Sequence, residues 1–240
     1  MISLEPVRGL PEVRPGDDLA ALLAAAAELR PGDVLAVAHK VVSKAEGRVV
    51  RLEDVTPGPR ARSLATEHGK DPRQVEVILS QTAELVRADA GRLICRTHHG
   101  FVCANAGVDA SNAGAPGTLV LLPEDPDASA RALRARLGAA VVITDSFGRA
   151  WRHGQCEVVI GCAGLAPVED WRGRPDDDGR ALAATVIAIA DEVAAAADLV
   201  RGKDSREPAV VVRGLERHVL GEDGPGAAAL LRARDTDLFR

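Results

Sequence analysis

Aromatic side chains are almost absent from this chain. Phe, Trp and Tyr together make up 2% of its 240 residues, and Tyr does not occur at all. Side chains on which nucleic-acid bases could stack are therefore scarce. An excess of basic charge is also lacking, because 30 basic and 35 acidic side chains leave a net charge of −5. The sequence thus gives no reason to expect nucleic acid or an anionic membrane surface as a partner.

Long apolar runs are missing as well. The longest is far shorter than the roughly 20 residues that a membrane-spanning helix needs. The N-terminal segment MISLEPVRGLPEV has no basic stretch followed by an apolar core, so no signal peptide is expected and the sequence predicts a cytoplasmic protein. The four cysteines form no C-x-x-C pair, which favours reduced and buried thiols.

Apolar stretches predict a mixed set of strands and helices. Strands are expected at residues 33–40, 92–97, 101–107, 118–123, 139–145, 156–164 and 208–214. Helices are expected at residues 19–30, about 59–87 with a break near 69–72, 125–138 and 176–202. Because these elements do not follow a strict βαβ rhythm, the fold class is predicted to be α+β, a mixed α/β sheet protein. The chain has no P-loop motif and no Rossmann glycine motif after a strand.

Polar side chains follow the apolar strand at residues 139–145. The stretch that ends at Gly154 contains, in order, Thr144, Asp145, Ser146, Arg149, Arg152 and His153. Asp and Ser often end strands by starting a turn, which requires no function. The alternative is a site that uses these oxygens and the cations beyond them. A serine nucleophile is not favoured, because the chain lacks a G-x-S-x-G elbow.

A second polar group lies between Cys103 and Gly114. Glycines and small residues surround Asp109, Ser111 and Asn112 there. Glycine lets the backbone approach a ligand closely, and Mg²⁺ takes one or two carboxylates together with phosphate oxygens and water. Asn, Asp and Gly also form plain turns, so a metal site and a turn are both open at this point.

Lysines and a turn offer contacts to a phosphate or a base. Lys40 and Lys44 follow the strand predicted at residues 33–40. A lysine there can place a point charge on phosphate, or it can lie in solvent as an ordinary surface lysine. The Gly9–Glu12 turn can contact a base through its backbone, or it can simply lead into the first helix.

A zinc site is the alternative raised by a short segment rich in Cys and His. Its possible ligands are Cys95, His98, His99 and Cys103. The spacing C-x-x-H-H-x-x-x-C matches no structural zinc pattern. Strand packing and an acceptor-binding histidine are the other interpretations of this segment.

Five stretches occur in one order along the chain: GLPEVRPGDDL, GDVLAVAHKVVSKAEGRVV, ICRTHHGFVCANAGVDASN, ITDSFGRAWRHGQCEVVIGCAGLAPVEDWRG and PAVVVRG. Together they resemble the coenzyme F420-0:gamma-glutamyl ligase family over about residues 2–220. The VSKAEG, GVDASN and TDSFGR stretches are distinctive in combination.

The resemblance implies a fold of two interwoven subdomains and a GTP-dependent amide ligase. Such an enzyme joins L-glutamate to coenzyme F420-0 and then adds further glutamates through gamma linkages, in the biosynthesis of coenzyme F420. Two divalent ions, Mg²⁺ or Mn²⁺, and a homodimer are also implied. Residues 1–220 correspond to the ligase domain. Residues 221–240 form a tail that looks like the start of a connection to the flavin reductase domain of some actinobacterial relatives.

The resemblance also assigns roles to single residues of this sequence. The nucleotide-binding positions are Gly9, Leu10, Pro11, Glu12, His39, Lys44, Asn112 and Lys203. The metal ligands are Asp109, Asp145 and Ser146. The catalytic roles fall to Lys44, Asp109 and Asp145. Lys203 opens a nucleotide-binding loop over residues 203–210, in which Glu207 stands where a small residue is more usual.

Asp109 and Asp145 lie 36 residues apart in the sequence, and we expect them to converge. Two carboxylates held together repel each other unless a cation neutralises them, and bound Mg²⁺ would also bridge the phosphates of GTP. Transfer of the gamma-phosphoryl group to the acceptor carboxylate gives an acyl phosphate, which the glutamate amine attacks. Lys44 would offset the phosphate charge.

Two other functions fit the same residues. One is a nucleotide- or metal-binding module without ligase activity. The other is a carboxylate–amine ligase that acts on a different acceptor.

Arg149, Arg152 and His153 are the candidates for binding the phosphodiester and carboxylate of F420-0, because guanidinium groups suit both anions. Replacing Arg152 by Ala is expected to raise the apparent KM for F420-0 and to leave GTP affinity intact. Steady-state kinetics with each substrate varied in turn measures both. An unchanged KM for F420-0 would contradict this assignment.

Overall fold

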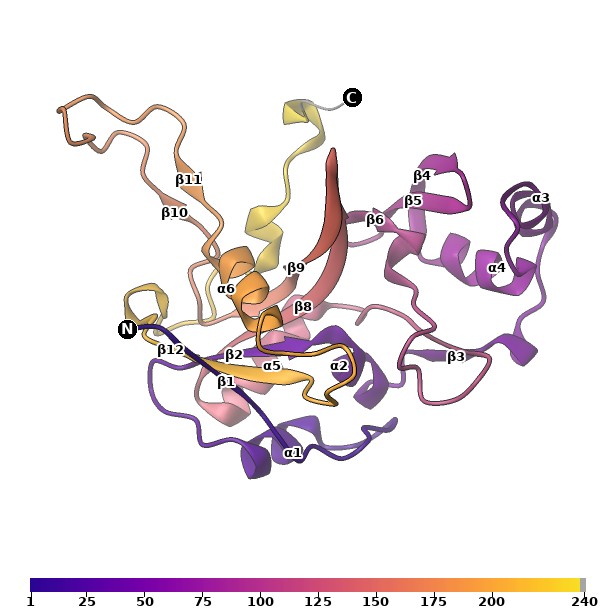
Figure 1. The fold of residues 1–240 in the computed structure, drawn as a ribbon, viewed down its shortest axis with the longest axis horizontal. Helices are drawn as coiled ribbons and strands as arrows, with labels where there is room; N and C mark the ends of the chain where they lie inside the picture. The colour runs from indigo at the N-terminus through magenta and orange to yellow at the C-terminus, as the bar shows by residue number, and fades with distance from the viewer. Residues whose placement is uncertain (238–240) are drawn as a thin grey trace.

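A five-stranded sheet forms the centre of the structure, a computed structural model in which residues 1–237 are described (Figure 1). Its strands, in spatial order, are β1 (Ser3–Pro6), β12 (Ala209–Arg213), β2 (Val34–Ala38), β8 (Ala140–Arg149) and β9 (Arg152–Ala163). Strands β2 and β8 run parallel, and the other neighbours are antiparallel. The parallel pair therefore lies in the middle of the sheet.

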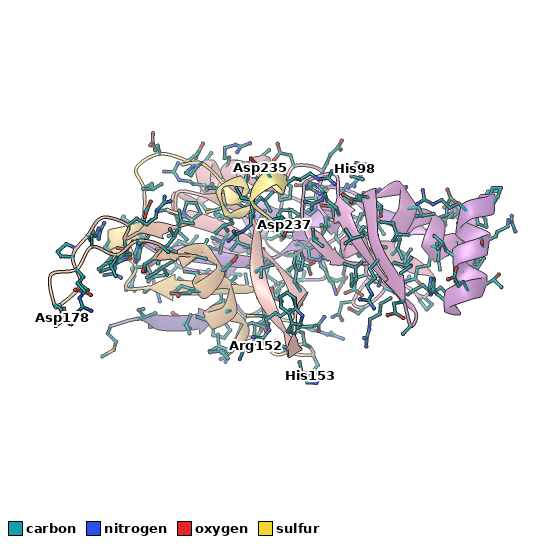
Figure 2. The ribbon with its side chains drawn as sticks, turned by 90° about the horizontal axis from the view of Figure 1, so that it is seen from above. His98, Arg152, His153, Asp178, Asp235 and Asp237 are labelled. Atoms are coloured by element: carbon teal, nitrogen blue, oxygen red, sulfur yellow. The ribbon has the colours of Figure 1, made fainter. Side chains whose placement is uncertain are left out.

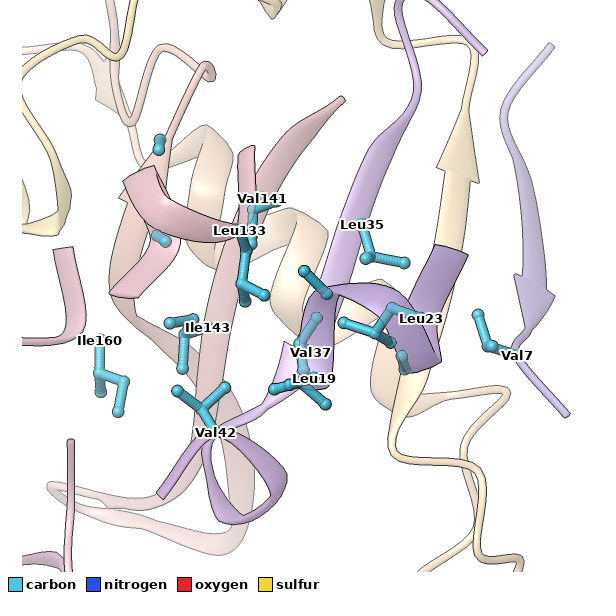
Figure 3. Packing of buried hydrophobic residues seen from close by; sticks show 14 of the residues in the cluster. Val7, Leu19, Leu23, Leu35, Val37, Val42, Leu133, Val141, Ile143 and Ile160 are labelled. Carbon is cyan, nitrogen blue, oxygen red and sulfur yellow. The ribbon is translucent and has the colours of Figure 1, made fainter. Parts of the chain in front are cut away.

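Both faces of this sheet are covered, which explains why its central strands are apolar throughout. On one face, Leu35, Val37 and Ile143 pack among helices α1 (Leu19–Ala26), α2 (His39–Ala45) and α5 (Pro126–Leu137) (Figure 3). On the other face, the alternate residues of β2 and β8 pack against α6 (Ile189–Asp198). The strand period of two thus divides each central strand between two hydrophobic clusters.

A second hydrophobic core lies beside the sheet and is built from the middle of the chain. Its helices are α3 (Pro59–His68) and α4 (Pro72–Ser80), with a 3-10 turn at Leu52–Asp54. Its strands are β4 (Thr82–Asp89), β5 (Arg92–Thr97) and β6 (Val102–Ala104) in one sheet, and β3 (Val49–Arg51) and β7 (Thr118–Val120) in another. The chain forms this part after β2 and α2 and then returns to the main sheet through α5 and β8. The predicted α+β fold class is confirmed.

Two segments project from the body, as Figure 1 shows. One is the far end of the β8–β9 hairpin. The other is an arm whose base is the pair β10 (Glu169–Asp170) and β11 (Val186–Ile187). Among the described residues, no helix is long and apolar enough to cross a membrane.

The C-terminal tail runs back over the body in short 3-10 turns at Glu216–His218, Ala227–Leu230 and Arg234–Thr236. Ala227 is buried, and its backbone N–H donates a hydrogen bond of 2.8 Å to Asp127 in α5. The predicted tail at 221–240 extends past the described residues, because 238–240 lie outside them.

Several of the predicted boundaries are wrong, and two of these errors change the type of element. The strand predicted at 33–40 ends at Ala38, and His39 begins helix α2. The helix predicted to reach residue 87 stops at Ser80, and β4 follows from Thr82. Pairing of β4 with β5 across the tight turn at Ala90 and Gly91, which both have positive φ, overrides the local helical pattern.

The long helix predicted at 176–202 is also wrong, because only Ile189–Asp198 is helical. The carboxylate of Asp176 accepts hydrogen bonds from the backbone N–H groups of Asp178 and Arg180, which closes a turn instead of starting a helix. Figure 2 places Asp178 at the outer end of the projecting arm. A run of acids that suggested a helix N-terminus therefore marks a turn.

Gly161 in β9 allows the start of α5 to pack directly on the sheet. A Cβ at this position would lie 2.2 Å from the carbonyl oxygen of Pro126, a contact that requires the backbone to move. Gly161→Ala is therefore expected to lower the free energy of unfolding by about 1–3 kcal/mol, measured by chemical denaturation. Gly148→Ala is the matched control, since nothing lies within 4 Å of its added Cβ. An equal effect of the two changes would contradict this account of the packing.

Candidate functional site

The candidate site lies at the edge of the main sheet where the parallel pairing of β2 with β8 ends. Ala38 pairs with Thr144 at this edge. His39 leaves β2 there to begin α2, and Asp145 follows Thr144 within β8, which continues to Arg149 in the β8–β9 hairpin. Strand β12 is antiparallel to β2 and begins at the same edge, where Ala38 N–H donates a hydrogen bond of 2.8 Å to the carbonyl of Pro208. In open α/β sheets, ligands bind outside the carboxyl ends of parallel strands.

Asp109 enters the site from a loop that pairs with the end of β7. Its backbone exchanges hydrogen bonds with Val120, at 3.1 and 2.8 Å. Its carboxylate accepts a hydrogen bond of 2.6 Å from the Nζ of Lys40. Partial burial alone would raise the pKa of Asp109, but hydrogen bonds from Lys40 and Ser111 lower it below 3.8. Asp109 is therefore a carboxylate at neutral pH.

Asp145 lies on the other side of the start of α2. Its Oδ1 is 3.3 Å from Nε2 of His39, which is almost fully buried, and accepts a hydrogen bond of 2.8 Å from the N–H of Ser146. His39 and Lys40 are adjacent residues of α2. The structure therefore brings Asp145 and Asp109 to the same end of one short helix.

Lys44 lies one turn further along α2 and is buried. The Nζ of Lys44 donates a short hydrogen bond to Oε1 of Glu12, in the Gly9–Glu12 turn. Glu12 and Pro11 also line a groove of about 470 Å³ against α1, within the size range of ligand pockets. The predicted nucleotide-binding turn therefore contacts the predicted nucleotide-binding lysine.

A buried carboxylate, Glu157, joins β8 and β9 to the loop before β12. It is 3% exposed and lies opposite Ser146 in the β8–β9 register. It accepts a hydrogen bond from the Oγ of Ser146, and its oxygens lie 2.8 Å from Arg201 and 3.1 Å from Lys203. The Nζ of Lys203 also donates a hydrogen bond of 2.6 Å to Ser146. Ser146 and Lys203, both predicted site residues, are thus in direct contact.

The loop that carries Lys203 is tied to the N-terminal segment. The Nε of Arg8, which precedes the Gly9–Glu12 turn, donates a hydrogen bond of 3.0 Å to Glu207. Glu207 therefore joins two predicted nucleotide-binding segments. Asn112 lies in the exposed loop after Asp109, with a positive φ of 53°.

The structure does not bring the three predicted anion-binding residues into this cluster. Arg149, Arg152 and His153 lie at the far end of the β8–β9 hairpin, where Figure 2 labels the last two. Arg149 lies four residues beyond Asp145 along β8, a span of about 13 Å. The guanidinium of Arg149 donates a hydrogen bond of 2.9 Å to the carbonyl of His153, so the tip is closed on itself.

The zinc alternative has no geometric support. Cys95 and Cys103 are buried partners across β5 and β6, and burial raises the pKa of Cys103 to about 12. His98 lies 3.2 Å from the carbonyl of Ser80, and His99 lies 3.0 Å from two other carbonyls. The segment serves strand packing.

Oxygen donors at the site suit a hard divalent cation. Carboxylate and hydroxyl oxygens come from Asp109, Asp145 and Ser146, and such oxygens are the ligands that Mg²⁺ and Mn²⁺ prefer. Within residues 1–237, no three His, Cys, Asp or Glu side chains gather into a ready-made metal cage. Mg²⁺ usually binds through one or two carboxylates plus waters and substrate phosphates. The donor set therefore fits an ion that is completed by a phosphate ligand.

Three residues of the cluster had no assigned role in the sequence-based prediction. Lys40 was considered only as one of two lysines, and Glu157 and Arg201 were missed. A signal for Glu157 is visible in the sequence, because it is the single charged residue in the apolar run CEVVIGCAG. A charge in an otherwise buried strand needs a partner, but the sequence does not say that Arg201 supplies it.

Comparison with known proteins identifies the family of the chain. The sequence profile described as F420-0:Gamma-glutamyl ligase matches residues 9–214. The chain belongs to the F420-0:gamma-glutamyl ligase family. The match includes every segment of the cluster, from the Gly9–Glu12 turn to the strand β12.

Relatives of similar length carry one name. The chain is 48% identical to a coenzyme F420:L-glutamate ligase of Methanopyrus kandleri, over 100% of this chain and 98% of that protein. It is 45% identical to the protein of the same name from Methanothermobacter thermautotrophicus, over 100% and 99%, and 48% identical to that of Halobacterium salinarum, over 98% and 94%. The likeness therefore extends over whole chains.

Glu157 and Arg201 form an ion pair in which both side chains are buried. Removing one member of such a pair leaves an uncompensated charge, so Glu157→Gln is expected to lower the free energy of unfolding by about 3 kcal/mol. Glu28→Gln, which removes an exposed carboxylate beside Arg30, is the control and should change it by less than about 0.5 kcal/mol. Chemical denaturation at pH 7 measures both.

The effect of Glu157→Gln should also depend on pH. Burial alone would raise the pKa of Glu157, but Arg201, Ser146, Thr144 and Lys203 together lower it below the ordinary 4.5. A carboxyl group with a lowered pKa in the folded state contributes stability above its ordinary pKa, and this stability is lost as the pH falls through the lowered pKa. The difference between wild type and variant should be full at pH 7 and shrink below pH 4.5. A difference that stayed constant down to pH 3 would contradict the ion-pair explanation.

Proposed function

We propose that this protein is a GTP-dependent ligase that adds L-glutamate to coenzyme F420-0 and extends the product by gamma-linked glutamates. The observation that carries the proposal is the meeting of Asp109, Asp145 and Lys44 around one short helix, in a chain of this family. The relatives' name, coenzyme F420:L-glutamate ligase, supports glutamate ligation and F420 biosynthesis. The proposal also includes GTP as the energy source, which the relatives' name does not specify.

The chemistry requires activation of a carboxylate, which is a poor electrophile. The gamma-phosphoryl group of GTP is transferred to the acceptor carboxylate, the bond to the beta-phosphate breaks, and GDP leaves. The amine of L-glutamate then attacks the resulting acyl phosphate and displaces inorganic phosphate. Lys44, held one helical turn from His39, offsets negative charge on the transferred group.

Asp109, Asp145 and Ser146 would hold the divalent ions, Mg²⁺ or Mn²⁺, two in number. Bound ions supply neutralisation of phosphate charge and alignment of the transferred group. The Gly9–Glu12 turn, His39, Asn112 and the loop at 203–210 would contact the nucleotide. Glu157 would keep Ser146 and Lys203 in place.

A homodimer and a cytoplasmic location belong to the same proposal. Arg149, Arg152 and His153 at the hairpin tip stay the proposed binding residues for the anionic groups of F420-0. A ligase for another acceptor would use the same nucleotide machinery, so the acceptor must be identified directly.

The test is GDP release by the purified protein with GTP, Mg²⁺ and L-glutamate, with and without F420-0, while the acceptor mass is followed. The expected result is GDP release that requires both substrates, together with mass increases of one glutamyl unit each. Asp145→Asn should lower the rate by at least about a hundredfold, because it removes a charged ligand from the site. ATP in place of GTP tests the choice of nucleotide.

GTP binding without any increase in acceptor mass would contradict the proposal and favour a binding module or a different acceptor. Glu28→Gln is the matched control for Asp145→Asn. It removes an exposed carboxylate on the opposite end of α1 from the Glu12 groove and should keep the wild-type rate.

A further inference from the structure

The amine of Lys40 lies in a cage of three oxygen atoms. It is 2.6 Å from Oδ2 of Asp109, 2.6 Å from Oγ of Ser111 and 3.1 Å from the carbonyl oxygen of Ser111. The side chain of Lys40 is only 20% exposed. A carboxylate, a hydroxyl and a backbone carbonyl around one positive charge are also the ligands of a hard metal cation.

The cage is fixed by its own hydrogen bonds. The backbone N–H of Ser111 donates to Oδ1 of Asp109 at 2.7 Å, and the Oγ of Ser111 lies 2.9 Å from Oδ2. The backbone of Asp109 is held by Val120. The loop therefore keeps these oxygens together around whichever cation lies between them.

Lys44 is on the same helix as Lys40, but its amine has a different carboxylate partner. Its amine contacts Glu12 in the Gly9–Glu12 turn and not Asp109. Two lysines one helical turn apart thus have separate carboxylate partners, so the charge of Lys40 and the charge of Lys44 can be removed independently.

We propose that Lys40 is an internal counter-ion of the Asp109 site, which its ammonium group occupies until a divalent cation displaces it. This inference rests on the proposed function, in which Asp109 is a metal ligand. An ammonium group and a divalent ion cannot both contact Oδ2 of Asp109, because their positive charges repel each other. Two unit charges about 4 Å apart repel by roughly 1 kcal/mol in water, and the repulsion is larger for a divalent ion and in a partly buried site.

Displacement makes metal binding depend on the nucleotide. Without nucleotide, the divalent ion must move the Lys40 amine away from three oxygens and leave it without a partner. With nucleotide present, phosphate oxygens beside α2 offer the displaced amine a new partner. Metal and nucleotide are then expected to bind with positive coupling, and each should increase the affinity of the other.

The test is Mn²⁺ binding to the full chain without nucleotide, measured from the electron paramagnetic resonance signal of free Mn²⁺. Lys40→Gln vacates the cage and is expected to bind Mn²⁺ about tenfold more tightly than wild type. Mn²⁺ should also raise the melting temperature of Lys40→Gln more than that of wild type. A non-hydrolysable GTP analogue should increase Mn²⁺ affinity in wild type much more than in Lys40→Gln.

Three variants separate displacement from a general change in charge. Lys44→Gln removes an equal charge one turn away without vacating Asp109, so its Mn²⁺ affinity should rise by no more than about twofold. Lys40→Arg keeps the charge and should stay near wild type. Lys40→Gln/Asp109→Asn should lose the gain, because the gain requires the Asp109 carboxylate.

The outcomes distinguish the inference from the proposed function. If Asp109→Asn weakens Mn²⁺ binding but Lys40→Gln binds no more tightly than Lys44→Gln, the metal site stands and the counter-ion role of Lys40 is overturned. If wild type binds no Mn²⁺ even with the GTP analogue, the proposed metal site fails and the inference fails with it. Tighter binding confined to Lys40→Gln supports both.

Discussion

The parallel pairing of β2 with β8 is the constraint on which the site depends. The pairing ends at one edge of the sheet, where His39 leaves β2 next to Asp145 of β8. The antiparallel neighbour β12 then brings the loop of Lys203 to the same edge, and β1 brings the Gly9–Glu12 turn after it. Segments that are far apart in the sequence meet at this edge, because the directions of the strands place all of them there.

Charged side chains lie close together at this edge and form ion pairs. Four cations of the cluster each have a carboxylate partner: Lys40 has Asp109, Lys44 has Glu12, and Arg201 and Lys203 share Glu157. Partly buried charges need such partners, since an isolated one is costly. Binding a nucleotide and a cation is therefore an exchange of ionic partners, in which phosphate competes with Glu12 for Lys44 and the metal competes with Lys40 for Asp109. Arg201 and Glu157 are the most deeply buried of these pairs, and they keep the segments around them in place.

The sequence predicted the central strands and the site segments well, for physical reasons. Val141–Ile143 is β-branched and apolar, which favours a strand buried on both faces, but the strand runs past its predicted end at Asp145 to Arg149, because β9 pairs with it. Its failures share one cause: hydrogen-bond partners that the apolar pattern does not reveal decide the structure. Thr82–Arg87 becomes a strand because β5 pairs with it, and Asp176 closes a turn in an arm instead of capping a helix. The pairing of Glu157 with Arg201, 44 residues later, likewise needs the fold to be known.

The most direct test of the account is a crystal structure of the protein with a non-hydrolysable GTP analogue and Mn²⁺, with anomalous scattering recorded at the manganese edge. The account predicts anomalous peaks about 2 Å from carboxylate oxygens of Asp109 and Asp145, phosphates between Lys44 and the Lys203 loop, and the amine of Lys40 moved off Asp109. Manganese and nucleotide bound away from the edge where the β2–β8 pairing ends, with the Lys40–Asp109 pair intact, would contradict it.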